Sequence, residues 1–261
     1  MRTAGLLLFL SVLPACSDDG QAAEVRGGRD RVEGVAGGTV ALGIRDLNYR
    51  PMAVGVAASI DGTVTLDSAA RDSIVPVTRN REECGDSARV TETSPANVLV
   101  WIDGITAGKA LPEIRRDEIV IDECRYAPRV LAVIAGTTIN VKSRDKLVLT
   151  SRFYLEGAPE PVAEVHTVDE GQVVPDEKIG ARAGIVEIRA PEQPWIRGYI
   201  AVFDHPYFAV ADENGRFTID SLPPGTYTVK AWHERLDKPT EQRVVVGSGG
   251  TGRVEFRLAG R

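Results

Sequence analysis

Three histidines and three cysteines are the side chains of this chain best suited to metal binding or redox chemistry. His205 and His233 stand in D-H-P-Y and W-H-E, within a strand-like pattern, and both are expected to be buried, hydrogen-bonded structural residues. A metal site that uses both is the alternative, although no third ligand suggests itself. His166 lies in the polar segment 156–178 and is expected to be exposed.

Residues 1–16 have the features of a processing segment. Arg2 supplies a positive start, residues 6–13 form an apolar core too short to span a bilayer, and L-P-A-C, ending at Cys16, resembles a bacterial lipoprotein box. We therefore expect a lipid on Cys16 to anchor the chain to a membrane in the periplasm. In such lipoproteins the following Ser17 slightly favours the outer membrane. A cleaved signal with an incidental cysteine is the alternative.

Cys84 and Cys124 then remain, and we expect them to form a disulfide. An exported chain sits in an oxidising compartment, where two leftover cysteines usually pair. Closing a loop of about forty residues should stabilise the fold by roughly 3–4 kcal/mol. A metal site or a reactive thiol is the alternative, but no histidine neighbours either cysteine in the sequence.

The sequence contains no recognisable catalytic motif. A nucleophile motif, a phosphate-binding loop and paired carboxylates in a recognisable frame are all missing, so we expect neither an enzyme nor a cofactor. The formal net charge is −6, and no cluster of Lys and Arg stands out. Nucleic acid is therefore not an expected partner.

Short β-strands must position these residues. Residues 199–203 and 208–211 are apolar runs, and D-E-N-G at 212–215 indicates a hairpin, because Asn-Gly tolerates the positive φ of a tight turn. Phe217 and Ile219 alternate with polar residues, which is the period of a half-buried strand. Further strand-like runs lie upstream, at 62–67, 97–102, 130–134 and 139–141. No long helical period occurs, so the chain is expected to be all-β.

Two stretches carry a resemblance to known families. D-x-x-G-x-F-x-I-x-x-L-P-P-G-x-Y-x-V, from Asp212 to Val229, resembles the regulatory-type β-sandwich found beside metallocarboxypeptidases. The longer string from Trp195 to Leu236, together with C-x-Y-x-P at 124–128, resembles bacterial periplasmic proteins in which a plastocyanin-like (cupredoxin) domain runs into that sandwich. The resemblance implies a cupredoxin-like Greek-key β-sandwich followed by a carboxypeptidase regulatory-like (prealbumin-like) β-sandwich.

This resemblance suggests four segments along the chain. After the signal peptide at 1–16, residues 17–53 are rich in Gly, Asp, Arg and Ala and are expected to form a flexible spacer. A short docking element at 44–49 is the alternative there. The cupredoxin-like domain is expected at 54–196 and the regulatory-like sandwich at 197–261.

The resemblance also implies where copper ligands would stand. Cupredoxins bind copper through two His, one Cys and usually a Met. At the corresponding positions this chain has Leu149, Ala190, Gln193 and Ile196, whereas the flanking Asp145, Pro194 and Trp195 match the motifs. All four ligand positions are lost, so we expect packed hydrocarbon and no type 1 copper.

These observations favour a non-catalytic interaction module, an accessory or scaffold subunit of a membrane-bound complex. The family background makes an electron-transfer complex the expected kind. A module that binds a glycan or another small ligand is the alternative, with four aromatic residues as candidate contacts: Trp195, Tyr207, Phe208 and Trp232. These aromatics are more often core or interdomain packing at such spacings. A residual metal or electron carrier is the third alternative.

Overall fold

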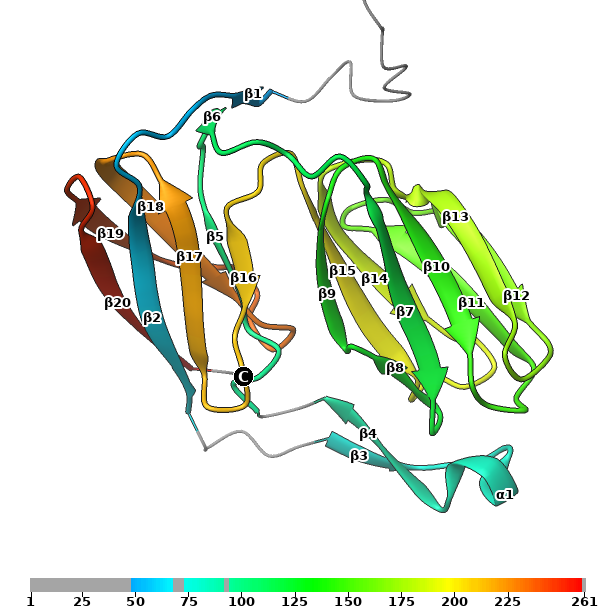
Figure 1. Cartoon of the computed structure of the whole chain (residues 1–261). Helices are drawn as coiled ribbons and strands as arrows, with labels where there is room; N and C mark the ends of the chain where they lie inside the picture. The colour runs from blue at the N-terminus through cyan, green and yellow to red at the C-terminus, as the bar shows by residue number, and fades with distance from the viewer. Residues whose placement is uncertain (1–47, 68–72, 92–93, 260–261) are drawn as a thin grey trace, which may run out of the picture. The chain divides into compact units, whose positions relative to one another are not determined.

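The computed structural model describes residues 48–67, 73–91 and 94–259. The expected signal peptide with Cys16, and most of the expected spacer, lie outside these residues. Within them the chain forms twenty β-strands and one short helix, which confirms the all-β class (Figure 1). No helix in the described ranges is long and apolar enough to cross a membrane.

One β-sandwich, which we call the split sandwich, is built from both ends of the described chain. Its two sheets have the strand orders β17-β2-β20 and β16-β5-β18-β19. Alternation of apolar and polar residues gives β20 one buried face, with the pattern eBeBeBeB, whereas the apolar β5 is covered on both faces. The strands are β2 (Ala58–Leu66), β5 (Leu99–Ile102), β16 (Phe208–Val210), β17 (Arg216–Leu222), β18 (Gly225–Trp232), β19 (Thr240–Val246) and β20 (Thr251–Leu258).

A second sandwich, the inserted sandwich, is formed by the residues between β5 and β16. Its two sheets have the orders β13-β10-β7-β8 and β12-β11-β14-β15-β9, and a large apolar cluster fills the space between them. The strands are β7 (Arg116–Asp122), β8 (Arg125–Ala127), β9 (Val130–Ile134), β10 (Thr137–Ser143), β11 (Leu149–Leu155), β12 (Ala163–Thr167), β13 (Val173–Gly180), β14 (Gly184–Arg189) and β15 (Arg197–Phe203).

These pairings correct the expected boundary between residues 196 and 197. β2 and β5, expected in the first domain, pair with β17, β20, β16 and β18 of the second. β15, expected in the second domain, pairs with β14 and β9 of the first. A strand pattern reports which face is buried but not which distant strand completes the sheet. In sequence, one sandwich is therefore inserted into the other.

The folded part also begins earlier than the expected end of the spacer at residue 53. β1 (Arg50–Pro51) pairs in parallel with β6 (Ala107–Gly108). Tyr49 is buried, donates a hydrogen bond from its hydroxyl to the carbonyl of Lys109 (2.6 Å), and packs edge-on against Tyr207. The end of the expected spacer is therefore part of the split sandwich.

The predicted disulfide between Cys84 and Cys124 is confirmed, with a Cα–Cα distance of 5.4 Å. Cys84 ends helix α1 (Arg81–Cys84), which connects strands β3 (Ser73–Pro76) and β4 (Ser87–Thr91) of a hairpin. Cys124 lies in the turn between β7 and β8. The bond therefore ties the hairpin to the inserted sandwich.

Candidate functional site

The four positions where the resemblance places copper ligands lie at one end of the inserted sandwich. Leu149 begins β11, and the other three follow β14, which pairs with β11 so that Arg152 faces Arg189. All four side chains are buried, and Leu149, Ala190 and Ile196 belong to the same apolar cluster. The structure therefore brings these predicted positions together, but as core packing.

The donor set at this end does not fit type 1 copper. Leu149, Ala190 and Ile196 carry no donor atom, and both cysteines of the described chain are in the disulfide. The side-chain oxygen of Gln193 and the indole nitrogen of Trp195 are buried without a hydrogen-bond partner. In the described ranges no group of three or more His, Cys, Asp or Glu is placed to hold a metal ion.

Asp145, which matches the flanking motif, has a structural role. Its two carboxylate oxygens accept hydrogen bonds from the backbone N–H groups of Glu123 (2.9 Å) and Cys124 (2.8 Å). Both of these residues have positive φ, of 49° and 57°, in the turn between β7 and β8. A carboxylate that binds two backbone N–H groups stabilises this left-handed turn, so Asp145 supports the position of the disulfide.

The two sandwich-motif histidines are buried and hydrogen-bonded, as predicted. His205 Nδ1 accepts a hydrogen bond from the Tyr207 backbone N–H (3.2 Å), and burial lowers its pKa. His233 Nδ1 accepts one from the Arg235 backbone N–H (3.4 Å), and burial lowers its pKa to about 4. His166 is exposed, beside Glu164, also as predicted.

Three of the four candidate aromatics are almost fully covered, although Trp232, which is 9% exposed, also lines a cavity of about 310 Å³. Trp195, Tyr207 and Trp232 are buried. The Tyr207 hydroxyl accepts a hydrogen bond from the Lys109 backbone N–H (2.6 Å) and donates one to the Ser221 carbonyl (3.0 Å). Phe208 is half-buried and stacks on Phe203, with 4.8 Å between ring centroids. These four residues therefore pack the structure and do not form an exposed platform for a sugar.

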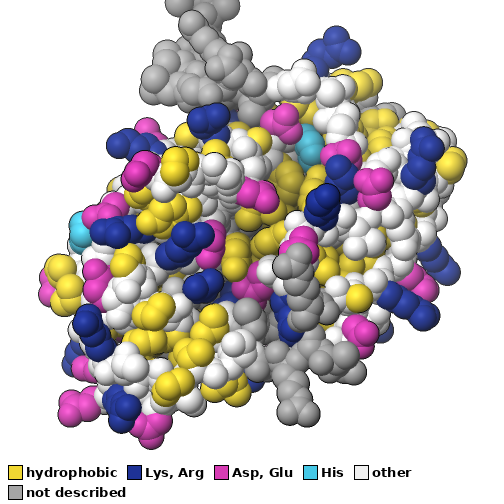
Figure 2. Space-filling view, turned by 180° about the vertical axis from the view of Figure 1, so that it is seen from behind, with side chains coloured by type: hydrophobic (Ala, Val, Ile, Leu, Met, Phe, Trp, Pro, Cys, Tyr) yellow, Lys and Arg dark blue, Asp and Glu magenta, His cyan; other side chains and the backbone are white. Residues whose placement is uncertain are grey.

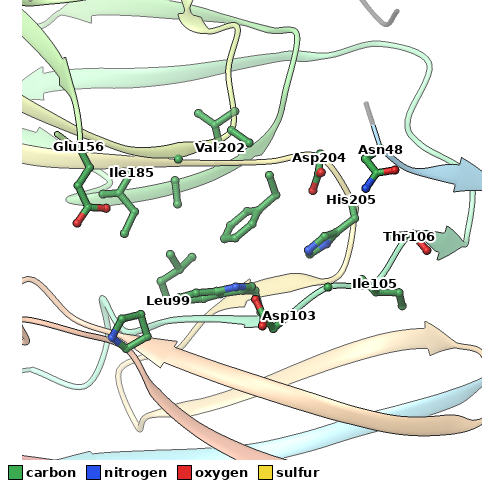
Figure 3. A pocket seen from close by; sticks show the side chains of 17 residues that line it. Asn48, Leu99, Asp103, Ile105, Thr106, Glu156, Ile185, Val202, Asp204 and His205 are labelled. Carbon is green, nitrogen blue, oxygen red and sulfur yellow. The ribbon is translucent and has the colours of Figure 1, made fainter. Parts of the chain in front are cut away.

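A cavity of about 380 Å³ lies where strands of both sandwiches meet, next to a small apolar cluster that contains Leu99, Ala201 and Trp232 (Figure 3). Residues 99–106 contribute one wall, and residues 183–185 and 201–205 contribute the other. Figure 2 shows hydrophobic side chains gathered along a hollow on a surface where acidic and basic side chains are otherwise interspersed. No sequence pattern predicts this pocket, because its walls come from separate sheets.

Among the described residues, the pocket is lined by three carboxylates and by no Lys or Arg. Asp103 and Asp204 lie close enough to His205 to oppose the lowering of its pKa, and Figure 3 places His205 between them. Glu156 lies at the opposite end of the pocket (Figure 3). Lys230 forms an ion pair with Asp103 at 2.9 Å.

A buried ion pair links the two sandwiches. Arg129, just before β9, donates from Nε and Nη2 to the carboxylate of Glu234, which follows β18. Arg129 also donates to the carbonyl oxygens of Val90 and Arg197. No sequence pattern predicts this pair, because nothing local distinguishes Arg129 and Glu234 from the charges of a solvated surface.

Three exposed valines lie at the same end as the four former ligand positions. Val148 precedes β11, Val168 follows β12, and Val173 begins β13. The pairing of Leu149 with Thr167 brings the first two together, and the connection from β12 to β13 brings the third to the same end. We call these three residues the valine patch. Apolar side chains gathered on a surface are candidates for protein contacts.

One family model matches the C-terminal part of the chain. Residues 199–259 match the Carboxypeptidase regulatory-like domain. The match covers most of the split sandwich, together with β15 of the inserted one. No curated protein matches this chain.

Cupredoxins occur among the solved structures that are similar to this chain. A purple cupredoxin from Nitrosopumilus maritimus is 16% identical, with a TM-score of 0.28, over 33% of this chain and 98% of that one. Amicyanin from Paracoccus versutus is 14% identical, with a TM-score of 0.29, over 35% and 84%. A copper-containing nitrite reductase from Thermus scotoductus is 19% identical, with a TM-score of 0.29, over 38% and 24%. Each of these similarities covers less than half of this chain.

Proposed function

We propose that this protein is a non-catalytic interaction module, held at a periplasmic membrane surface by a lipid on Cys16, and an accessory or scaffold subunit of a membrane-bound complex. The observation that carries the proposal is the end of the inserted sandwich where the resemblance places copper. Inside, that end is packed with Leu149, Ala190 and Ile196, and outside it presents the valine patch. A sandwich without redox ligands still offers its surface to a partner.

Anchoring supports this role physically. A lipid-tethered body has a high effective concentration near membrane proteins, so even a modest interface stays occupied. An electron-transfer complex is the kind of partner that we favour, because of the resemblance to cupredoxins.

The test is affinity isolation of the full-length protein from membranes solubilised in mild detergent, with identification of what co-purifies. We expect a stable complex that is lost in the Val148→Asp/Val168→Asp variant. Val245→Asp, which changes an exposed valine on β19 of the other sandwich, is the matched control and should retain the partner. A protein that always migrates alone at its monomer mass would contradict the proposal.

Anchoring is tested separately by Cys16→Ser. The variant should leave the membrane fraction unless the partner retains it, and labelled fatty acid should be incorporated only into the protein with Cys16. If Cys16 carries no lipid, the proposed membrane anchor is wrong, whereas the proposed interface with a partner protein is unaffected.

Binding of a small ligand is the second candidate function. The specific observation that favours it is the cavity beside His205, whose volume lies in the range of roughly 300–1,000 Å³ typical of ligand sites. The buried Trp195, Tyr207 and Trp232 do not contribute to this candidate.

A further inference from the structure

Three rings form a row along the pocket that lies between residues 99–106 and 201–205. The centroid of Trp101, on β5, is 5.7 Å from that of Phe203, at the end of β15. The centroid of His205 is a further 5.6 Å from Phe203. Trp101 and Phe203 are half-buried, so part of each ring remains accessible from the pocket.

The charged side chains that line the pocket along this row of rings are all acidic among the described residues. Asp103 and Asp204 flank His205, and Glu156 lies at the other end of the pocket (Figure 3). Lys230 pairs with Asp103, but among the described residues neither Asp204 nor Glu156 has an ion-pair partner. These two carboxylates are therefore available to a ligand.

His205 does not offset this charge. Its Nδ1 accepts the Tyr207 backbone N–H, and its burial disfavours the protonated ring. As far as the described residues line it, the pocket therefore presents aromatic surface and carboxylates, without a cationic side chain.

We propose that this pocket binds a small organic cation, an amine or ammonium group attached to an apolar or aromatic body. A cation gains from the accessible parts of the Trp101 and Phe203 rings, one face of Phe203 being stacked on Phe208, and from the negative charge of Asp204 and Glu156. An anion would be repelled by the same carboxylates. A sugar hydroxyl can also donate to these carboxylates, but a neutral sugar gains nothing from their negative charge, so the lining favours a cation. This site is independent of the proposed scaffold role.

The test uses three probes that share one aromatic body and differ in charge: phenylethylammonium, phenylethanol and phenylacetate. Each is titrated calorimetrically into the full-length protein in mild detergent. We expect phenylethylammonium to bind about tenfold or more tightly than phenylethanol, with an affinity that falls as salt is added, and phenylacetate not to bind. Equal affinities for phenylethylammonium and phenylethanol would contradict the proposal that the pocket recognises the positive charge.

Matched variants locate the site. Glu156→Gln/Asp204→Asn should weaken phenylethylammonium roughly tenfold and leave phenylethanol almost unchanged. Glu160→Gln, in the same loop as Glu156 but outside the pocket lining, should change neither affinity. The single variant Glu156→Gln is titrated with phenylethylammonium and phenylethanol in the same way. Glu156 is exposed, so its replacement does not disturb the core. Undiminished binding of phenylethylammonium to both variants that carry Glu156→Gln would refute the proposal. Methyl glucoside is titrated as an additional sugar probe, and its binding in place of phenylethylammonium would refute the proposal as well.

Discussion

The guanidinium of Arg129 and the carboxylate of Glu234 form an ion pair between the two sandwiches, and their side chains are only 10% and 2% exposed. Taking two charges out of water is costly, and the arrangement is stable only while both partners and their hydrogen bonds are present. The pair therefore depends on the two sandwiches remaining in contact.

We expect Arg129→Met to lower the free energy of unfolding by roughly 3–5 kcal/mol, because it leaves Glu234 buried without its counter-ion. Arg129→Met/Glu234→Leu should lower it less, since no charge is then left unpaired. Denaturant unfolding measures both effects. The control is Arg125→Met, which breaks an exposed pair with Glu123 and should cost less than about 1 kcal/mol. If Arg129→Met and Arg125→Met lowered the free energy of unfolding by the same amount, the prediction would be wrong.

The disulfide gives a second prediction. Cys84→Ser should lower the free energy of unfolding by roughly 2–5 kcal/mol, because Cys84 and Cys124 are 40 residues apart and their bond restricts the unfolded chain. Thermal unfolding should show a lower midpoint, and adding reductant to the unaltered protein should reproduce the shift. Free thiols at both cysteines in non-reducing peptide mapping would show that the bond is not formed.

Copper binding is the third prediction. Protein mixed with Cu(II) and then dialysed should retain no tightly bound metal and show no intense blue colour, because Leu149, Ala190 and Ile196 offer no ligand and Gln193 offers only a neutral amide. Metal analysis and visible absorption provide the measurement. One equivalent of tightly held copper in the native protein would contradict both this prediction and the scaffold role.

His233 makes stability depend on pH. In the unfolded chain His233 takes up a proton below its ordinary pKa of 6.5, whereas burial keeps the folded side chain neutral until about pH 4. Its contribution to stability is therefore complete above pH 6.5 and declines as the pH falls from there toward 4, by at most about 1.4 kcal/mol per pH unit. The adjacent Glu234 opposes this lowering of the pKa, whereas Arg129 and Arg235 reinforce it.

The measurement is the free energy of unfolding by denaturant at a series of pH values across that window. His233→Gln should flatten the dependence, and His166→Gln, which changes an exposed histidine, should not. A slope that is identical in the protein and in the His233 variant would show that His233 is not the group responsible. His205, whose pKa burial also lowers, should add to the slope that remains.

Local patterns predicted the strands better than their partners. The turn at Asn214-Gly215 forms as predicted, with a positive φ at Gly215 and a hydrogen bond from its N–H to the Asp212 carbonyl. It does not close a hairpin, however, because β16 pairs with β5 and β17 pairs with β2 in the other sheet. Turn chemistry determines where the chain reverses, but burial of the flanking faces determines which strands pair.

The same distinction applies to the sites. The core character of Leu149, Ala190 and Ile196 was predictable, because these are apolar side chains within an otherwise matching motif. The pocket was not, since it requires Trp101 and Phe203 to meet across sheets of different sandwiches. No local sequence pattern predicts that two residues of different sheets lie next to each other.

The parallel pairing of β2 with β20 sets an order on folding. Val64 faces Phe256 in this pair, so the sheet that starts near the beginning of the described chain is complete only when its last strand has been made. Every strand of the inserted sandwich is available earlier, and a chain synthesised from its N-terminus can close that sandwich first. Until β20 arrives, β2 has one unpaired edge, and an unpaired edge is a template for another chain. A ribosome that stops before Thr251 would therefore release a protein with one finished sandwich and one prone to aggregate.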